Sequence, residues 1–232
     1  CISSAASDVY KRQLNDLTGS YQELWPVILA DEYQQTWLDD CTALVGEENA
    51  EAAFEKLSSM VTGDVYGEDA VEAYANGGGA YFCGFTNSLA TLTFDGETST
   101  ISGTDKDGNV LFSHTYHYIG MEPVHGLYEF ESDDADSGEF TYFFLAPDTS
   151  AETYHIEFRY GSDAEALSQY DAGEYAYWLA SGISTDCDQT MIDNCIELFC
   201  TENLAGQYAE CDVEQKRRGT FLHKNYLKEV FS

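Results

Sequence analysis

The sequence predicts a mainly β protein in which an antiparallel sheet closes into a barrel, with helices flanking it on the N- and C-terminal sides. Three observations predict this class. Tyr, Phe and Thr recur in alternating runs between about residues 79 and 161, and these residue types favour strands. The hairpin dipeptides Asp95-Gly96 and Asp107-Gly108 fall inside this region. No helix predicted there is long enough for the crossover that parallel strands require.

The part of the chain before this region is expected to be helical. From Ser20 to Leu38, apolar residues recur at spacings of three and four, which marks one buried helical face. Pro26 is expected to kink or restart this helix. A second helix is expected from Glu47 to Met60, and glycines then punctuate a loop-rich passage.

Seven short strands are predicted after that passage, separated by turn signals. They cover residues 80–85, 90–94, 99–102, 110–119, 126–131, 139–145 and 153–160. Helical segments are expected again at residues 163–170 and 188–204. Because barrels of this size commonly fold as one unit, residues 14–215 are expected to form a single domain.

The charge of the chain excludes several classes of partner. The formal net charge is −32, and between Gln13 and Gln215 the only basic residues are Lys56, Lys106 and Arg159. A nucleic-acid-binding surface needs clustered Lys and Arg, so no nucleic acid or anionic membrane surface is expected as a partner. No apolar run approaches the ~18 residues that span a bilayer, so no transmembrane segment is expected. Cations and cationic partners are compatible with this charge, but we favour the simpler interpretation that the acidic residues keep an extracellular protein soluble. The charge alone identifies no metal.

The cysteines predict a disulfide framework. The seven are spread without a C-x-x-C pair, and setting Cys1 aside leaves six that permit three bridges. These candidates are Cys41, Cys83, Cys187, Cys195, Cys200 and Cys211. Such bridges persist in oxidising compartments, which predicts export. Cys195 and Cys200 lie five residues apart on one predicted helix, so we expect them to bridge outward, to the barrel or the N-terminal helix, rather than to each other.

The two ends of the chain differ from its interior. Cys1 followed by small polar residues is typical of the lipid-anchored start of a mature bacterial lipoprotein. The alternative, which we favour, is that residues 3–13, reading SSAASDVYKRQ, are translated adapter DNA. Residues 216–232 hold five of the ten basic residues and form an uncertain tail. Neither end carries a functional argument.

Ordered motifs over about two thirds of the chain resemble the ZinT/YodA family of secreted zinc-binding proteins, whose domain also occurs in some streptococcal zinc-uptake lipoproteins. The motifs are Thr18 to Pro26 (TGSYQELWP), Tyr118-Ile119-Gly120, Gly126 to Glu131 (GLYEFE), Asp134 to Phe140 (DADSGEF), Ala146-Pro147, His155 to Gly161 (HIEFRYG) and Tyr175 to Trp178 (YAYW). The resemblance implies a lipocalin-like (calycin) barrel.

The resemblance also implies a zinc site built from three histidines. His155 matches the first histidine of the family's H-x-H strand, Glu157 replaces the second, and Phe143 stands where the family has the upstream histidine. Residues two apart on a strand point to one face, so His155 and Glu157 are expected to face the barrel interior together. Candidates for further ligands are His125 and His117, and also His114, which lies on the opposite strand face from His117.

Two functions are consistent with these features. The first is an extracytoplasmic protein, periplasmic, secreted or lipid-anchored, that binds zinc and passes it to the binding protein of a zinc ABC transporter. The alternative is a metal-free relative whose barrel binds a small molecule, glycan or protein. An enzyme is not expected, because the sequence shows neither a nucleophile with its base nor a recognisable carboxylate pair.

Overall fold

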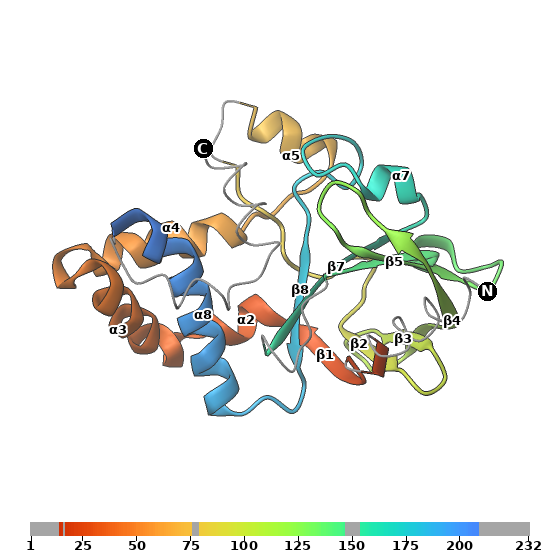
Figure 1. Cartoon of the computed structure of the whole chain (residues 1–232), viewed down its shortest axis with the longest axis horizontal. Helices are drawn as coiled ribbons and strands as arrows, with labels where there is room; N and C mark the ends of the chain where they lie inside the picture. The colour runs from red at the N-terminus through yellow and green to blue at the C-terminus, as the bar shows by residue number, and fades with distance from the viewer. Residues whose placement is uncertain (1–13, 16, 76–78, 147–153, 209–232) are drawn as a thin grey trace.

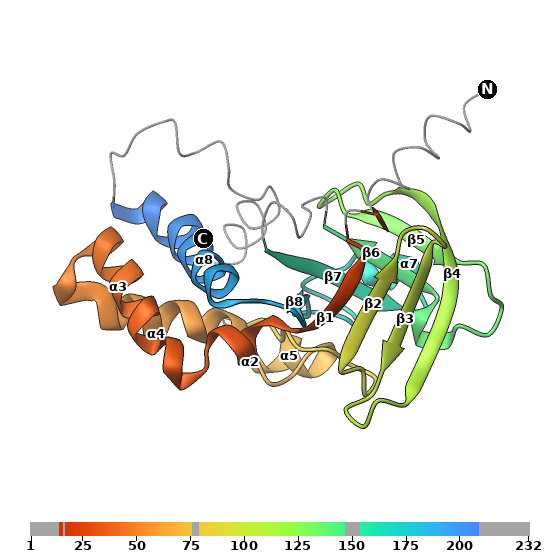
Figure 2. The ribbon, with the colours of Figure 1, turned by 90° about the horizontal axis from the view of Figure 1, so that it is seen from below.

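The computed structural model describes residues 14–15, 17–75, 79–146 and 154–208. It consists of a closed antiparallel barrel with a layer of helices beside it (Figures 1 and 2). Cys1 and Cys211, together with the predictions for residues 1–13 and 216–232, lie outside the described residues. No helix within the described ranges combines the length and the apolar character needed to cross a membrane.

Eight strands form the barrel, each paired with the next along the chain. They are β1 (Gly19–Glu23), β2 (Thr91–Asp95), β3 (Thr100–Thr104), β4 (Val110–Met121), β5 (Tyr128–Ser132), β6 (Tyr142–Leu145), β7 (His155–Gly161) and β8 (Ala180–Ser184). The pairing of β1 with β8, in which Tyr21 lies opposite Ser184, closes the sheet. Closure leaves no unpaired sheet edge, as in other up-and-down barrels.

Most of the helical residues lie in the insertion between β1 and β2 and in the helix that follows β8. The α-helices are α2 (Leu24–Ile28), α3 (Gln34–Val45), α4 (Ala50–Val61), α5 (Glu68–Ala73), α7 (Ala164–Leu167) and α8 (Gln189–Tyr208), with 3-10 turns η1 (Asp31–Tyr33), η2 (Glu47–Asn49) and η3 (Gly138–Phe140). The last helix, α8, packs along α3 and also contacts α2 and α4, while α2 packs beside β8. These four helices therefore form the layer next to β1 and β8 (Figure 1).

Aromatic rings fill the barrel interior. Phe143 is fully buried and stacks with Tyr160 at a centroid distance of 5.3 Å and with Phe112 at 6.0 Å. Phe85, which precedes β2, packs edge-on against Phe158 of β7 at 5.3 Å. Rings of this size contribute the largest share of apolar burial in a core. The interior is therefore a packed core made by side chains from several strands.

Two predicted elements were wrong, and one strand was not predicted. Residues 80–85 form no strand, and Phe82 makes only isolated bridges to Thr62 and Trp178. Residues 19–23 form β1 rather than the start of a helix, because pairing with β2 and β8 outweighs the apolar spacing that continues into α2. The sequence also gave no signal for β8. Its central residue is Gly182, where a Cβ atom would lie 3.1 Å from Ile156 and 3.3 Å from Tyr21, and glycine weakens strand propensity.

A candidate metal site between the barrel and the helices

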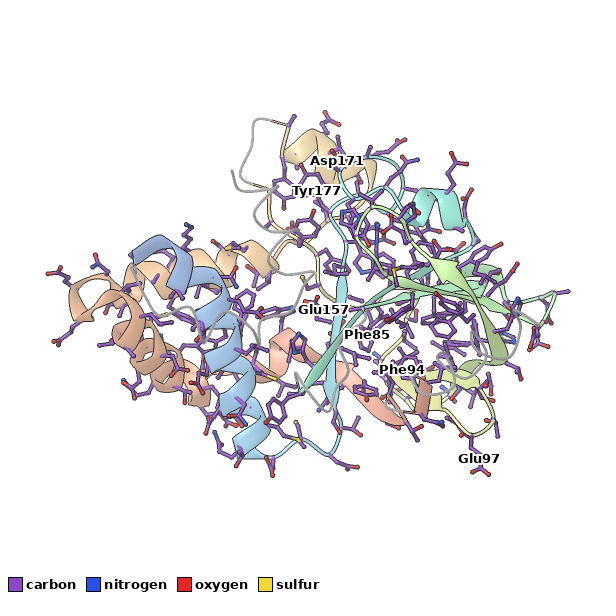
Figure 3. All side chains as sticks on the ribbon, viewed as in Figure 1. Phe85, Phe94, Glu97, Glu157, Asp171 and Tyr177 are labelled. Carbon is purple, nitrogen blue, oxygen red and sulfur yellow. The ribbon has the colours of Figure 1, made fainter. Side chains whose placement is uncertain are left out.

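The two residues that sequence reasoning placed together, His155 and Glu157, do share one face of β7. That face is not the interior. Phe158 and Tyr160 turn their rings into the core, and side chains alternate along a strand, so His155 and Glu157 point outward. Their surroundings are the helices, and Figure 3 shows Glu157 where the barrel and the helical layer meet. The expectation that the two face the barrel interior was wrong, because the rings of the even-numbered residues occupy it.

His155 contacts two further polar side chains. Its Nε2 atom lies 3.9 Å from Oε1 of Glu157, and its ring also hydrogen-bonds with the thiol of Cys195 on α8. Both His155 and Glu157 are only 7% exposed. Burial alone would lower the pKa of His155, but the hydrogen bonds with Cys195 and Glu157 outweigh it and raise the pKa well above its ordinary value.

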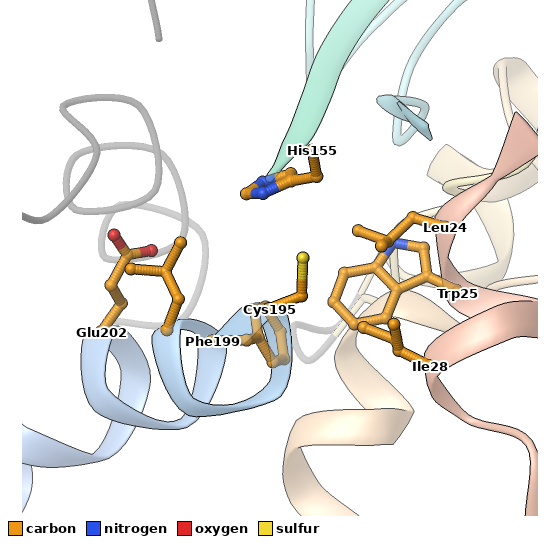
Figure 4. Close-up of a pocket in the computed structure, with 8 residues that line it drawn as sticks. Leu24, Trp25, Ile28, His155, Cys195, Phe199 and Glu202 are labelled. Atoms are coloured by element: carbon orange, nitrogen blue, oxygen red, sulfur yellow. The ribbon is translucent and has the colours of Figure 1, made fainter. Parts of the chain in front are cut away.

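A small cavity opens beside this cluster. It is lined by His155 and by residues of α2 and α8, namely Leu24, Trp25, Ile28, Cys195, Leu198, Phe199 and Glu202. Figure 4 shows the sulfur of Cys195 pointing toward the imidazole, with Trp25 on one side and Glu202 on the other. The cavity volume is about 10 Å³, which is room for about one water-sized particle.

A second thiol, that of Cys83, also lies near Glu157. Burial raises the pKa of the Cys83 thiol far above its ordinary value, and the negative charge of Glu157 raises it further. Cys83 is therefore a neutral thiol at physiological pH, held near Trp25 and Ser181. The outward face of β7 thus presents an imidazole and a carboxylate to two thiols, one from α8 and one from the segment before β2.

The structure does not bring His117 to this cluster. His117 lies on the outer face of β4, half exposed, where its Nδ1 atom is 2.8 Å from Asp133 and its Nε2 atom is 3.9 Å from Glu131. The strands β5 and β6 separate β4 from β7, a distance of ~14 Å at the usual strand spacing. His114 sits on the opposite face of β4, as predicted, and its Nδ1 atom is 2.9 Å from Asp134.

His125 lies in the loop between β4 and β5. Its backbone N–H donates to the buried carboxylate of Glu122 at 2.5 Å, and its ring packs on Tyr170 at 3.9 Å. Tyr170 in turn covers the guanidinium of Arg159 at 4.1 Å. Arg159 is four residues along β7 from His155, which is ~13 Å of strand. His125 is therefore associated with Arg159 rather than with the His155 cluster.

The contact from Cys195 is the feature that sequence reasoning missed. Cys195 had been considered only as a disulfide candidate, and no local pattern indicates that a residue of α8 lies against the start of β7. The five described candidates, Cys41, Cys83, Cys187, Cys195 and Cys200, are thiols in the structure. Within the described ranges, no three His, Cys, Asp or Glu side chains are gathered so that they hold a metal ion together.

One of the three comparisons with known proteins bears on the fold. No family model matches the chain, and no curated protein matches its sequence. Its fold is similar to the Zn(II)-bound ZinT-like domain of AdcA from Streptococcus pneumoniae, with a TM-score of 0.50 and 16% identity over 80% of this chain and 90% of that domain. Zn(II)-bound AdcA matches with a TM-score of 0.44 and 17% identity over 78% of this chain and 34% of that one. The prediction of a lipocalin-like barrel with flanking helices is confirmed.

Proposed function

We propose that this chain is an extracytoplasmic zinc-binding protein that takes up zinc at His155 and Glu157 and passes it to a zinc-uptake system. The observation that carries the proposal is that these two donors lie 3.9 Å apart and that one of them, His155, lines a cavity with room for about one water-sized particle. Two atoms bound to one zinc at ~2.0–2.2 Å lie no more than about 4 Å apart. His155 and Glu157 therefore reach a common ion after a small movement of either side chain.

The residues around the pair fit zinc in their chemistry. Imidazole nitrogen, thiolate sulfur and carboxylate oxygen are the three ligand types that zinc takes in proteins, and Cys195 and Glu202 supply the last two at the same cavity. The described residues do not form a ready three-donor site, so Cys195, which already contacts His155, and the carboxylates have to move closer together before three donors bind one ion. We expect weaker binding than that of a preformed site.

The size of the cavity supports an ion over an organic ligand. About 10 Å³ accommodates a water-sized particle and leaves no room for a substrate. Cys195, His155 and Glu157 also resemble a catalytic triad, in which a base activates a thiol nucleophile and an acid orients the base. Because a nucleophile needs space for its substrate, we propose a binding role rather than a catalytic one. The likeness to Zn(II)-bound structures supports the same choice.

Zinc titration of the metal-stripped chain by calorimetry tests this function. We expect one zinc site, at least roughly tenfold weakened by His155→Ala and also weakened by Cys195→Ala. His117→Ala is the matched control, because it removes an exposed histidine that is paired with acidic side chains, and it should leave the affinity unchanged. Absence of binding, or equal losses in the His155 and His117 variants, would refute the proposal.

The pH dependence of zinc binding provides a second arm. A bound proton competes with zinc for the imidazole, and the pKa of His155 is raised above its ordinary value. The affinity for zinc should therefore keep rising with pH through the neutral range. With a histidine of ordinary pKa, it would already have levelled off at a lower pH. In His117→Ala the same dependence is expected, whereas the residual binding of His155→Ala should depend less on pH in that range.

The alternative is a metal-free barrel that binds a small molecule, glycan or protein. The burial of Phe143 in the core, where the resembling family has a zinc-binding histidine, favours this alternative. The aromatic packing around Phe143 fills the barrel interior, so such a partner would bind at the barrel mouth or outside it. If calorimetry detects no binding of zinc to the folded, metal-stripped chain, at zinc concentrations up to the millimolar range, the result would favour this alternative function.

A further inference from the structure

Two buried thiols face each other across the helical layer, away from the candidate zinc site. Cys41 lies on α3 and Cys200 on α8, and their sulfur atoms are 3.9 Å apart. Both side chains are fully buried, and the two helices pack along each other (Figure 1). To form a disulfide, the two sulfur atoms have to close to ~2.05 Å, which requires rotation of the side chains and an approach of the two helices.

The surroundings of the other cysteines make this pair selective. Cys195 lies five residues before Cys200 on α8 and turns to His155 instead, so the two cysteines use different faces of the helix. Cys83 is held near Trp25 and Ser181 beside Glu157. Cys187 precedes α8 and is half buried. Among the described cysteines, Cys41 is therefore the sulfur that Cys200 meets.

The charges of the two helices supply an independent reason for a covalent link. Asp40 of α3 lies near Asp193 and Glu197 of α8 and near Asp39 of its own helix. Burial, followed by the like charges of Glu197, Asp193 and Asp39, raises the pKa of Asp40 to about 6. At neutral pH these carboxylates repel each other across the interface that contains Cys41 and Cys200. A bond between the sulfur atoms would hold the helices together against this repulsion.

We propose that Cys41 and Cys200 form a disulfide in an oxidising compartment and fasten the C-terminal helix to the helical insertion that follows β1. The reaction is thiol–disulfide exchange with the disulfide form of a thiol oxidoreductase, or a small disulfide, as the oxidant. One cysteine thiolate attacks the oxidant's disulfide, and the second displaces the oxidant from the mixed disulfide. The pair loses two electrons and two protons, and the oxidant's disulfide becomes two thiols. This proposal does not depend on zinc binding.

Mapping of the wild-type chain tests the connectivity directly. The full chain is incubated with oxidised glutathione, remaining thiols are alkylated under denaturing conditions, and peptides are analysed by mass spectrometry without reduction. A cross-linked peptide pair containing Cys41 and Cys200 is expected, with Cys195 alkylated. Alkylation of both Cys41 and Cys200, or a link from Cys200 to any other cysteine, would overturn the proposal.

Thermal unfolding tests the consequence of the bond. Because the cysteines are 159 residues apart, the link restricts a long segment of the unfolded chain, and reductant should lower the Tm of the oxidised protein by roughly 5–15 °C. Cys41→Ala, Cys200→Ala and the double variant should each lose this dependence on reductant. Cys187→Ala is the matched control and should keep it. Persistence of the reductant effect in the double variant contradicts the proposal, and the mapping decides the matter if a variant fails to fold.

Discussion

At the scale of single residues, the outward face of β7 holds a row of three charged or ionisable side chains, His155, Glu157 and Arg159. Arg159 is fully buried. Its guanidinium donates to the backbone carbonyls of Leu167, Gln169 and Tyr175. A buried charge is tolerated only where hydrogen bonds replace its water. Arg159 therefore fixes the segment from α7 to β8 against the barrel.

Substitution of Arg159 by lysine should destabilise the fold although it keeps the charge. A lysine ammonium cannot match the planar fork that reaches three carbonyl groups, and the unpaired acceptors would cost ~2–4 kcal/mol. Chemical denaturation of Arg159→Lys, followed by circular dichroism, measures this loss as a lower midpoint. Lys106→Arg, the reverse exchange at an exposed site, should leave the midpoint within error. Equal midpoints for the wild type and Arg159→Lys would refute the role.

The sequence predicted part of the candidate site. The two-residue period of a strand placed His155 and Glu157 on one face, and this was confirmed. In β7, polar His155, Glu157 and Arg159 alternate with apolar Ile156, Phe158 and Tyr160, and this alternation indicates that the polar face points away from the core. The sequence does not show that other elements cover the polar face, so that every residue of β7 is buried. The contact with Cys195 joins a strand to a helix distant in sequence, and only the packing of α8 against α2 and the barrel determines it.

At the scale of elements, the interface between α3 and α8 combines apolar packing with like charges. Trp37 packs edge-on against Phe199 at 5.9 Å, and Asp40 lies near Asp193 and Glu197. The pKa of Asp40 is about 6 in the fold against an ordinary value of 3.8. Because the folded state holds this proton more tightly, the contribution of Asp40 to stability decreases as the pH rises from about 4 to above 6.

Removal of this charge should stabilise the protein at neutral pH. Asp40→Asn is expected to raise Tm by about 1–2 °C at pH 7.5, a modest effect because Asp40 is partly exposed and screened by solvent. The gain should shrink toward pH 4 and with added salt. Calorimetry at both pH values measures it, and Glu55→Gln on the exposed face of α4 is the control for lost charge. A gain that is independent of pH would contradict the assigned repulsion.

The strands that were predicted correctly share a physical property that the missed strands lack. The strands β2 to β7 follow one another and are joined largely by turns that the sequence marks, such as Asp95-Gly96. The strands β1 and β8 pair with each other across almost the whole chain, so no local turn identifies them. The strand β1 is stabilised by its pairing with β2 and β8, and a pattern within residues 19–23 cannot reveal this pairing.

At the scale of the whole molecule, the barrel depends on glycines where large rings cross its interior. A Cβ atom on Gly103 of β3 would lie 2.3 Å from Leu89 and 2.4 Å from Phe112. Gly120 of β4 offers a contrast, because the nearest atom to its Cβ position is a Glu129 oxygen at 3.8 Å. Packing therefore requires glycine at position 103, whereas position 120 has room for a larger side chain.

Gly103→Ala should destabilise the chain by ~1–3 kcal/mol, because the added methyl group overpacks a filled core. Gly120→Ala should be neutral or slightly stabilising, since alanine restricts the unfolded chain without a clash. Urea denaturation of both variants measures the difference. If Gly103→Ala is as stable as Gly120→Ala, the barrel interior has more free space than the packing of Phe112 indicates.

The closure of the sheet by β1 and β8 has a consequence for the order of folding. Each hairpin from β2 to β7 brings together residues that are near in sequence, whereas Ser20 meets Thr93 across 73 residues. Bringing distant segments together costs more chain entropy and proceeds more slowly than forming local hairpins. The chain is thus expected to pass through an open curved sheet of β2 to β7, to which β1 and β8 have not yet been added, while the helical insertion after β1 folds. Its exposed edges during this interval are β2 and β7, and the high negative charge would then help to keep neighbouring chains apart.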